Sequence, residues 1–269
     1  MSQTDRAAVF RRLHQGPEVL VLANAWDGGS ARLIASLGAA AIATTSSGVA
    51  WAHGYQDGDQ LPVEIHAGTV RDIVRAVDVP VTVDAEGGYS HDLTAVGEAV
   101  RRLVDAGAVG INLEDGGGTP DLMCAKIEAV KRAAAGAGVD LFVNARTDVY
   151  LRQLAPPEGR VKESLTRGAR YVAAGAEGLF VPGATVAEEI RALAQGAGAP
   201  LNIMARPGLP TLVEMKALGV RRLSAGGAIS QALWGRMRVL AAAFLAEGAT
   251  DALFQDAMTY PDLNALMGK

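Results

Sequence analysis

The sequence predicts one (β/α)8 barrel, the TIM-barrel architecture, with a helical extension at its C-terminus. Eight short apolar runs typical of buried strands alternate with segments of helical periodicity. The length of 269 residues is close to the ~250 residues usual for such a barrel. A doubly wound sheet usually has fewer strands and a glycine-rich first turn, which this sequence lacks.

The predicted strands follow one another at spacings that leave room for a helix between most pairs. They cover residues 19–24, 40–46, 79–86, 108–115, 141–148, 177–183, 200–205 and 221–226. Helical periodicity is clear in SARLIASLG, EIHAGTVRDIVRAV, LTAVGEAVRRLVDAG and VKESLTRGARYVAAG. Glycines such as Gly107 and Gly175 close several of these segments, because glycine adopts the left-handed C-cap conformation without strain.

We expect residues 1–269 to form a single barrel domain, since no low-complexity linker or shift in composition divides the chain. Residues 227–269 contain the eighth helix, AISQALWGRMRVLAAAFLAEG, and a helical appendage that barrel closure does not require. Apolar residues such as Trp234 and Phe254 exceed what one barrel needs, so we expect this segment to contact another subunit. The alternative is that it folds back on its own barrel.

Composition narrows the class of protein. Hydrophobic residues make up 49% of the chain and aromatic residues only 5%, which indicates an aliphatic core. A net charge of −4, without any long Lys/Arg cluster, argues against nucleic acid as a partner. No apolar run is long enough for a membrane span, the N-terminal segment MSQTDRAAVFRRLHQG resembles an amphipathic helix, and Cys124 is the single cysteine. We therefore expect a cytoplasmic enzyme without a membrane partner.

Carboxylates collect at the carboxyl ends of the predicted strands, where barrel enzymes place their chemistry. Asp84 and Glu86 end the third strand at positions i and i+2, and Glu114 ends the fourth. Side chains two residues apart share one face of a strand, so the three carboxylates are expected to converge. Such a set needs a shared proton or a divalent cation, and ligands that are all oxygen favour Mg²⁺ or Mn²⁺ over zinc. Helix capping or pairing with Arg and Lys is the alternative for each acid.

Arg146 ends the fifth strand within NARTD, on the face expected to meet these acids. It either balances their charge or binds a substrate carboxylate or phosphate through its planar fork. Asp115 follows Glu114 and points the other way, so we expect it to be structural. Asn202 is the polar candidate on the seventh strand.

Two loops at the same face hold further candidates. TTSSG at 44–48 contains Thr45, Ser47 and Gly48, whose hydroxyl and backbone N–H groups could bind an anionic oxygen; a simple helix N-cap is the alternative. WAHGYQDGDQLP at 51–62 is an insertion that acts as a lid or brings Asp57 to the metal, unless it is only a solvated turn.

Five motifs carry a resemblance to a known family. NAWDGGSARL, TTSSGVAWAHGYQDGDQLP, VTVDAEGGYS, AGAVGINLEDG and FVNARTD, in this order, resemble the isocitrate lyase/phosphoenolpyruvate mutase superfamily, and within it the phosphonomutase-like and carboxyvinyl-carboxyphosphonate-mutase-like branch. The resemblance spans about residues 17–230. It implies a (β/α)8 barrel with Mg²⁺ at the strand ends, in homodimers or homotetramers that often exchange the eighth helix.

The resemblance also implies residue roles. A small α-oxo acid, or its enolate, would chelate a metal held directly by Asp84, with Asp57, Glu86 and Glu114 binding the metal's waters. The candidate catalytic residues are Arg146, Glu114 and Thr45, and the candidate substrate-binding residues are Ser47, Gly48, Asp84, Arg146 and Asn202. Glu86 is a departure, because the family commonly has Asp there.

A second departure follows the fourth strand. EDGGGTPDLMCAKIEAVKR replaces the lyases' K-[KR]-C-G-H loop, whose Cys protonates the departing enolate, and the mutases' longer gating loop is also missing. Cys124 falls on the predicted fourth helix instead. Isocitrate or methylisocitrate cleavage and phosphonomutase activity are therefore disfavoured.

We therefore expect a Mg²⁺-dependent lyase or decarboxylase that acts on a small α-oxo or 2-hydroxy dicarboxylate, such as oxaloacetate, through a metal-stabilised enolate. One alternative is a C–P bond enzyme, either a phosphonopyruvate hydrolase or a phosphoenolpyruvate mutase-like protein. The other is a non-catalytic binder of α-oxo acids.

Overall fold

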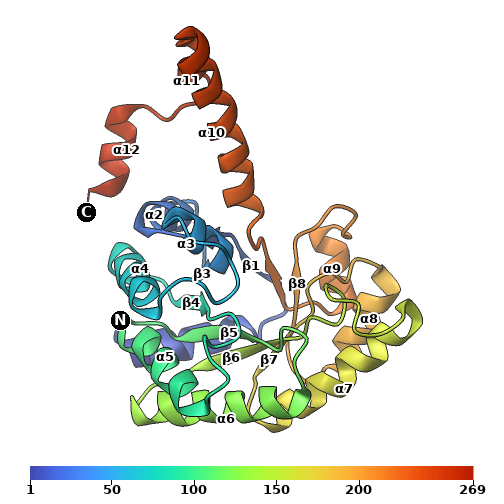
Figure 1. Cartoon of the computed structure of the whole chain (residues 1–269). Coiled ribbons are helices and arrows are strands. Elements are labelled where there is room, and N and C mark those ends of the chain that lie inside the picture. The colour runs from blue at the N-terminus through green and yellow to red at the C-terminus, as the bar shows by residue number, and fades with distance from the viewer. Residues whose placement is uncertain (269) are drawn as a thin grey trace.

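Parallel strands form a nearly closed barrel in the computed structural model, which describes residues 1–268 (Figure 1). The strands are β1 (Leu20–Leu22), β2 (Asn24–Ala25), β3 (Ile42–Thr44), β4 (Val81–Asp84), β5 (Gly110–Glu114), β6 (Phe142–Arg146), β7 (Gly178–Phe180), β8 (Leu201–Met204) and β9 (Arg222–Ser224). Because β1 pairs with β9 and β2 with β3, these two short strands together are the predicted first strand, interrupted at Ala23. The predicted (β/α)8 barrel is confirmed.

Helices surround the barrel and cover most of the outward-facing strand residues. They are α1 (Gln3–Leu13), α2 (Gly28–Ser36), α3 (Ser46–Ala52), α4 (Val63–Ala76), α5 (Leu93–Asp105), α6 (Pro120–Gly136), a 3-10 turn (Pro157–Gly159), α7 (Arg160–Ala173), α8 (Ala187–Gly196), α9 (Leu212–Leu218), α10 (Ala228–Glu247), α11 (Asp251–Phe254) and α12 (Tyr260–Met267). Helix α5 illustrates the local cause: Asp92 caps its start by accepting a hydrogen bond from Ala95 N at 2.8 Å, and its apolar face buries Val100 and Leu103. The outer core is therefore aliphatic, as expected.

Helix α1 plugs the amino-terminal end of the barrel. Phe10 is fully buried and packs with Leu22 and Phe142 inside the barrel. The Gln3 side-chain amide holds the helix in place by donating to the carbonyl oxygens of Val104 and Ala108, at 2.7 and 2.9 Å. This end of the barrel interior is therefore filled by apolar side chains.

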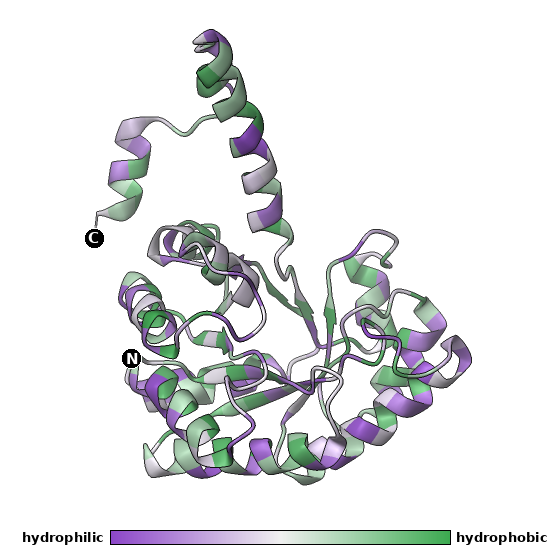
Figure 2. Cartoon of the chain, viewed as in Figure 1, coloured by the Kyte–Doolittle hydropathy of each residue, from purple (hydrophilic) through white to green (hydrophobic). Residues whose placement is uncertain are grey.

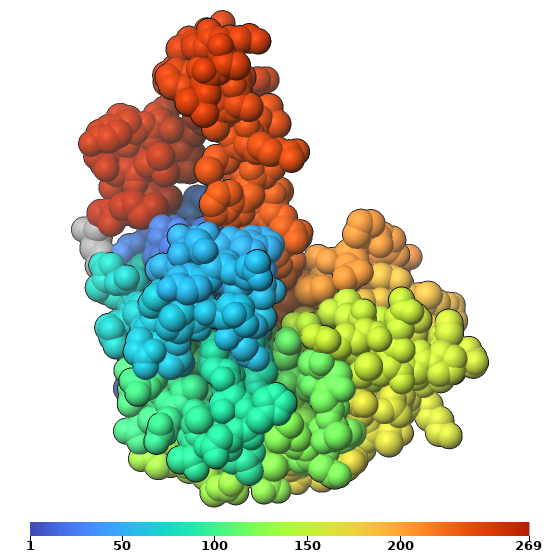
Figure 3. All heavy atoms as spheres, in the orientation of Figure 1, coloured from blue at the N-terminus to red at the C-terminus, as the bar shows by residue number. Residues whose placement is uncertain are grey.

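Helix α10 projects from the barrel instead of covering it (Figures 1 and 3). Ser230 is its buried residue, whereas most of its large apolar side chains are exposed. After α11 the chain returns, and α12 packs against α2 of the same barrel. Across residues 1–268 we find no helix with both the length and the apolar character needed to cross a membrane.

Candidate active site

A polar cavity of about 220 Å³ opens at the carboxyl ends of the strands. It is lined by Asn24, Thr45, Ser46, Ser47, Trp51, Asp57, Asp84, Asn112, Arg146, Phe180, Met204, Ser224, Gly226, Gly227 and Gln231. Its volume is below that of pockets for drug-sized ligands, so it suits a small metabolite. Larger hollows lie elsewhere on the surface, but this one is where the predicted site residues gather.

Asp84, the last residue of β4, supplies a half-buried carboxylate with few partners. Its backbone N–H donates to Thr44 Oγ1 at 2.8 Å, which fixes the strand end against β3. Within residues 1–268 the carboxylate accepts a single long hydrogen bond, from Ser46 N at 3.4 Å. Burial raises the pKa of Asp84, and the charge of Arg146 opposes that shift. A carboxylate in this position needs a proton or a cation to balance it.

Glu86 does not lie on the same strand face as Asp84, and that prediction is wrong. Strand β4 ends at Asp84, and Glu86 takes a left-handed conformation with φ of 50°. Its carboxylate accepts hydrogen bonds from the backbone N–H groups of Gly58, at 2.9 Å, and of Asp59. Burial, with smaller contributions from nearby Asp84 and other acids, raises the pKa of Glu86 to about 7. Glu86 thus fixes the insertion loop at the cavity, where Asp57 forms part of the lining.

Arg146, which lines the cavity, forms an ion pair with Glu114, which lies behind it. Arg146 Nη1 lies 2.5 Å from Glu114 Oε2, while its Nε and Nη2 donate to the two oxygens of Asp148 at 2.7 and 3.2 Å. Burial raises the pKa of Glu114 to about 8, although Arg146 opposes the shift. The structure therefore shows Arg146 balancing acids. Two of its five N–H groups donate to Asp148 and Nη1 pairs with Glu114, which leaves N–H groups for a ligand.

The segment 44–48 contributes three residues to the cavity and one behind it. Thr45 is the N-cap residue of α3 but makes no capping bond; its hydroxyl lies 3.1 Å from that of Ser47. Gly48 is buried away from the lining. A Cβ at position 48 would lie 2.7 Å from Thr45 Cγ2 and 3.1 Å from Trp26 Cβ. This position therefore requires glycine for steric reasons.

The residues fit a divalent cation bound mainly through one carboxylate. No group of three or more His, Cys, Asp or Glu side chains in residues 1–268 is arranged to bind an ion directly. Asp84 and Asp57 line the cavity, while Glu86 and Glu114 lie behind it and are engaged by other groups. This arrangement suits direct binding by Asp84, with the other acids acting through water.

Amides from the strands form the cavity floor. Asn112 lines the cavity, whereas Asn202 is buried below it and its Oδ1 accepts from Ser224 Oγ at 3.1 Å. Asn24 also lines the cavity; its amide links the loops after β3 and β9 by donating to Thr44 O at 2.7 Å and accepting from Gly226 N at 2.9 Å. Our candidate set missed Asn112, although its i, i+2 relation to Glu114 could have identified it.

Asp115 has the structural role expected for it. Its fully buried carboxylate accepts from Tyr171 Oη at 2.7 Å, Thr147 Oγ1 at 2.9 Å and Arg167 Nη1 at 3.0 Å. Cys124 lies on α6, with its Sγ 3.6 Å from the carbonyl oxygen of Arg170, and is not part of the cavity lining.

Known proteins resemble this chain over most of its length. The family model for phosphoenolpyruvate phosphomutase matches residues 10–245. A solved structure of a candidate phosphonomutase from Burkholderia cenocepacia has 42% identity and a TM-score of 0.83, over 88% of this chain and 99% of that one. An uncharacterised protein of Mycobacterium tuberculosis is 37% identical over 81% of each chain. An oxaloacetate decarboxylase of Paraburkholderia xenovorans is 28% identical over 85% of this chain and 77% of its own length.

Proposed function

The chain belongs to the phosphoenolpyruvate phosphomutase family, and on this premise we propose that it is a Mg²⁺-dependent carbon–carbon lyase acting on a small α-oxo or 2-hydroxy dicarboxylate. The observation that carries the proposal is the half-buried, nearly unpartnered carboxylate of Asp84 at a polar cavity of about 220 Å³. The relative named as an oxaloacetate decarboxylase supports oxaloacetate as the first substrate to test.

Each residue has a role in this proposal. Asp84 would hold Mg²⁺ or Mn²⁺ directly, with Asp57, Glu86 and Glu114 binding its waters. The cation, when bound, would polarise the oxo group and stabilise the negative charge that develops there as the bond breaks. Substrate carboxylates would bind the Ser47 hydroxyl, near Thr45, and the N–H groups of Arg146 that remain available. Gly48 would support this segment from behind the cavity.

The position of Cys124 favours decarboxylation among the lyase reactions. Its thiol lies on α6 outside the cavity lining, so it is not placed to protonate a departing enolate. Decarboxylation releases CO₂ and leaves an enolate that water can protonate. A reaction that needs no thiol donor therefore agrees better with this cavity.

Conversion of oxaloacetate to pyruvate tests the proposal, measured by coupled reduction of pyruvate with Mg²⁺ and again with EDTA. We expect metal-dependent turnover that Asp84→Asn abolishes without loss of the fold. Asp78→Asn, at an exposed acid, is the matched control and should leave turnover unchanged. Metal-dependent turnover that survives Asp84→Asn would contradict the assigned metal ligand.

A C–P bond enzyme is the second candidate, since both the family model and the Burkholderia neighbour are named for phosphonate chemistry. Release of phosphate from phosphonopyruvate, without turnover of oxaloacetate, would favour it. A non-catalytic binder of α-oxo acids is the third candidate. Tight, metal-dependent binding of oxalate without turnover of any candidate substrate would favour that interpretation.

We also propose that the protein is a cytoplasmic homodimer or homotetramer in which α10 packs on the barrel of a neighbouring subunit. The outer face of β1 supports this assembly. Val21 is 47% exposed there, although a barrel strand is normally covered by a helix on its outside. The exposed apolar side chains of α10 do not cover Val21 of their own barrel. They match the same exposed surface of β1 on a second copy.

A further inference from the structure

A layer of buried polar side chains forms the cavity floor and continues directly below it. They come from β5, β6, β8 and β9: Asn112, Asn144, Asn202, Arg222 and Ser224. Each is nearly inaccessible to solvent, and Arg222 is only 1% exposed. Most TIM barrels fill this level with branched apolar side chains. A polar layer that contains a charged arginine is therefore unusual, and it indicates a functional role.

Arg222 is a buried cation that forms no ion pair within residues 1–268. Its Nη2 donates to Asn112 Oδ1 at 3.2 Å and its Nε contacts Ser224 Oγ at 3.4 Å, while Nη1 has no partner among the described residues. Burial lowers the pKa of Arg222 to about 9, so the guanidinium remains charged at neutral pH. Keeping an unpaired charge inside a protein is costly. A packed apolar side chain would serve stability better at this position.

The contacts of Asn112 fix the direction of its amide. Its Oδ1 accepts from Asn144 Nδ2 at 2.9 Å as well as from Arg222 Nη2, and these two donors use both lone pairs of the oxygen. The amide therefore cannot be flipped without placing donors against donors. Since both donors lie below the floor, the Nδ2 N–H groups of Asn112 are left to face the cavity that it lines.

The groups below Arg222 do not neutralise it. His14, at the end of α1, donates from Nδ1 to Phe10 O at 2.9 Å and stacks on Phe142, and burial is the main cause that lowers the pKa of its ring to about 3. The nearby charges of Arg222 and Arg11 lower that pKa further. His14 is therefore neutral at physiological pH. The positive potential of Arg222 is balanced only from the cavity side, where Asp84 and its ligand would lie.

We propose that Arg222 is a positioning residue that holds the Asn112 amide with its N–H groups toward the cavity and makes the site selective for small dianionic acids. The substrate class depends on the proposed function; the geometry of Asn112 does not. In a low-dielectric interior a fixed charge acts over several ångströms, and it attracts a dianion more strongly than a monoanion of the same size. Arg222 and Asn112 thus favour a dianionic ligand over a monoanionic one, whereas Asp84 would bind the cation.

Oxalate and glyoxylate are the matched probes, since both have two carbons and they differ by one negative charge. Their dissociation constants are measured by calorimetry with Mg²⁺ for the wild type and for Arg222→Met, Arg222→Lys and Asn112→Asp. We expect Arg222→Met to weaken oxalate binding about tenfold or more and glyoxylate binding much less. Arg222→Lys keeps the charge and should retain most of the preference for oxalate.

Asn112→Asp separates the amide's role in binding from its role in folding. Aspartate can still accept from Arg222 and Asn144, so the thermal unfolding temperature should equal or exceed that of the wild type. It presents no N–H group to the cavity and neutralises Arg222, so oxalate affinity should fall at least as far as in Arg222→Met. A residue with a purely structural role would not combine retained stability with lost affinity.

Several outcomes would overturn the inference. These are an equal loss of oxalate and glyoxylate affinity in Arg222→Met, wild-type oxalate affinity in Asn112→Asp, and a wild-type chain that binds neither probe. Failure of the proposed function gives a different result, in which oxalate binds with the expected pattern in the variants but no candidate substrate is turned over.

Discussion

The acids of the site differ chiefly in their partners. Asp84 has one long hydrogen bond, Glu114 has an ion pair with Arg146, and Asp148 is held by two nitrogens of the same guanidinium. A carboxylate that is already satisfied gains little from a metal, whereas Asp84 gains a counter-charge. Asp84 is therefore the proposed direct ligand because it lacks partners, and the residue type alone does not reveal that lack.

Replacing Arg146 with Lys should lower both the affinity for oxalate and the stability of the fold. The substitution keeps the positive charge but loses the planar fork, so we expect oxalate affinity to fall at least about tenfold. Asp148 is 2% exposed and would lose a bidentate partner, which should lower the free energy of unfolding by about 2 kcal/mol. Calorimetry and chemical denaturation measure the two effects.

Arg152 supplies a matched control for that prediction. It also contacts Asp148, at 3.4 Å, but its side chain is mostly exposed and does not line the cavity. Arg152→Lys should therefore change neither affinity nor stability appreciably. Near-normal oxalate affinity in Arg146→Lys would limit Arg146 to balancing the charge of Glu114 and Asp148.

At the scale of elements, the loop from 53 to 62 depends on one side chain from another loop. The carboxylate of Glu86 accepts from two successive backbone N–H groups, at Gly58 and Asp59, and this places Asp57 at the cavity. Glu86→Gln keeps one acceptor oxygen but loses the charge that strengthens these bonds. We expect the amides of Gly58 and Asp59 to exchange with deuterium about tenfold faster, and KM to rise. Glu64→Gln on α4 is the control, and unchanged exchange in Glu86→Gln would show that the loop is held by other contacts.

Helix α1 should make stability depend on pH through His14. Burial lowers the pKa of His14 from about 6.5 to about 3, so between these values the unfolded chain binds a proton that the folded chain does not. The contribution is present above pH 6.5 and is lost as the pH falls toward 3, at up to roughly 1.4 kcal/mol per pH unit. His14→Phe, which can keep the stacking on Phe142, should flatten this acid dependence in urea unfolding curves measured from pH 7 to 4. An unchanged slope would show that His14 does not cause it.

The sequence predicts the strands better than it predicts their ends. Alternation placed Asp84 and Arg146 on one inner face of the barrel, and both line the cavity, because a period of two follows directly from strand geometry. It failed at Glu86, where contacts with a loop nearly thirty residues away hold a left-handed conformation. The sequence pattern also gave no reason to single out Arg222. RRLSAG alone is equally compatible with solvent-exposed arginines, and only the barrel structure shows that Arg222 is buried.

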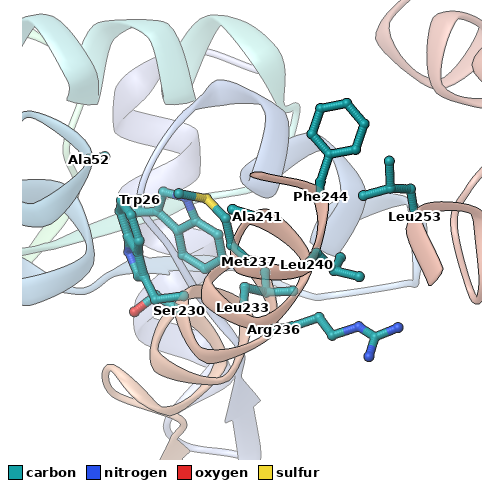
Figure 4. Close-up of a pocket in the computed structure, with 11 residues that line it drawn as sticks. Trp26, Ala52, Ser230, Leu233, Arg236, Met237, Leu240, Ala241, Phe244 and Leu253 are labelled. Carbon is teal, nitrogen blue, oxygen red and sulfur yellow. The ribbon is translucent and has the colours of Figure 1, made fainter. Parts of the chain in front are cut away.

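At the scale of the whole molecule, the main question is what α10 packs against. Its apolar stripe, formed by Ile229, Leu233, Met237, Leu240 and Phe244, fits a barrel surface, but the sequence does not say whose barrel it covers. In the structure α10 stands clear of its own barrel, and Figure 2 shows hydrophobic segments along it. An apolar hollow of about 590 Å³ forms beside it, lined by Trp26 and by Leu233, Met237 and Phe244 of α10 (Figure 4). Exposed apolar surface of this extent is typical of an interface.

A second copy of the chain is the occupant that fits both uncovered surfaces. The exposed outer face of β1, with Val21, needs a helix, and the exposed stripe of α10 needs a barrel. Exchange of α10 between two copies would satisfy both needs through one two-fold interface. A tail that folded back on its own barrel would cover Val21, yet here α12 packs against α2 and Val21 stays 47% exposed.

Sedimentation at micromolar concentration should therefore give a dimer or tetramer of the 27.8 kDa chain. Met237→Glu should dissociate it, because Met237 lines the apolar hollow and a buried charge there would lack a partner. Val239→Glu is the matched control: Met237 and Val239 are 55% and 56% exposed, but Val239 lies on the other side of α10 and outside the hollow. Truncation near residue 226 should also give a smaller species. A wild-type chain that sediments as a clean monomer would refute the exchange, and equal dissociation by both glutamate variants would show that the hollow is not the centre of the interface.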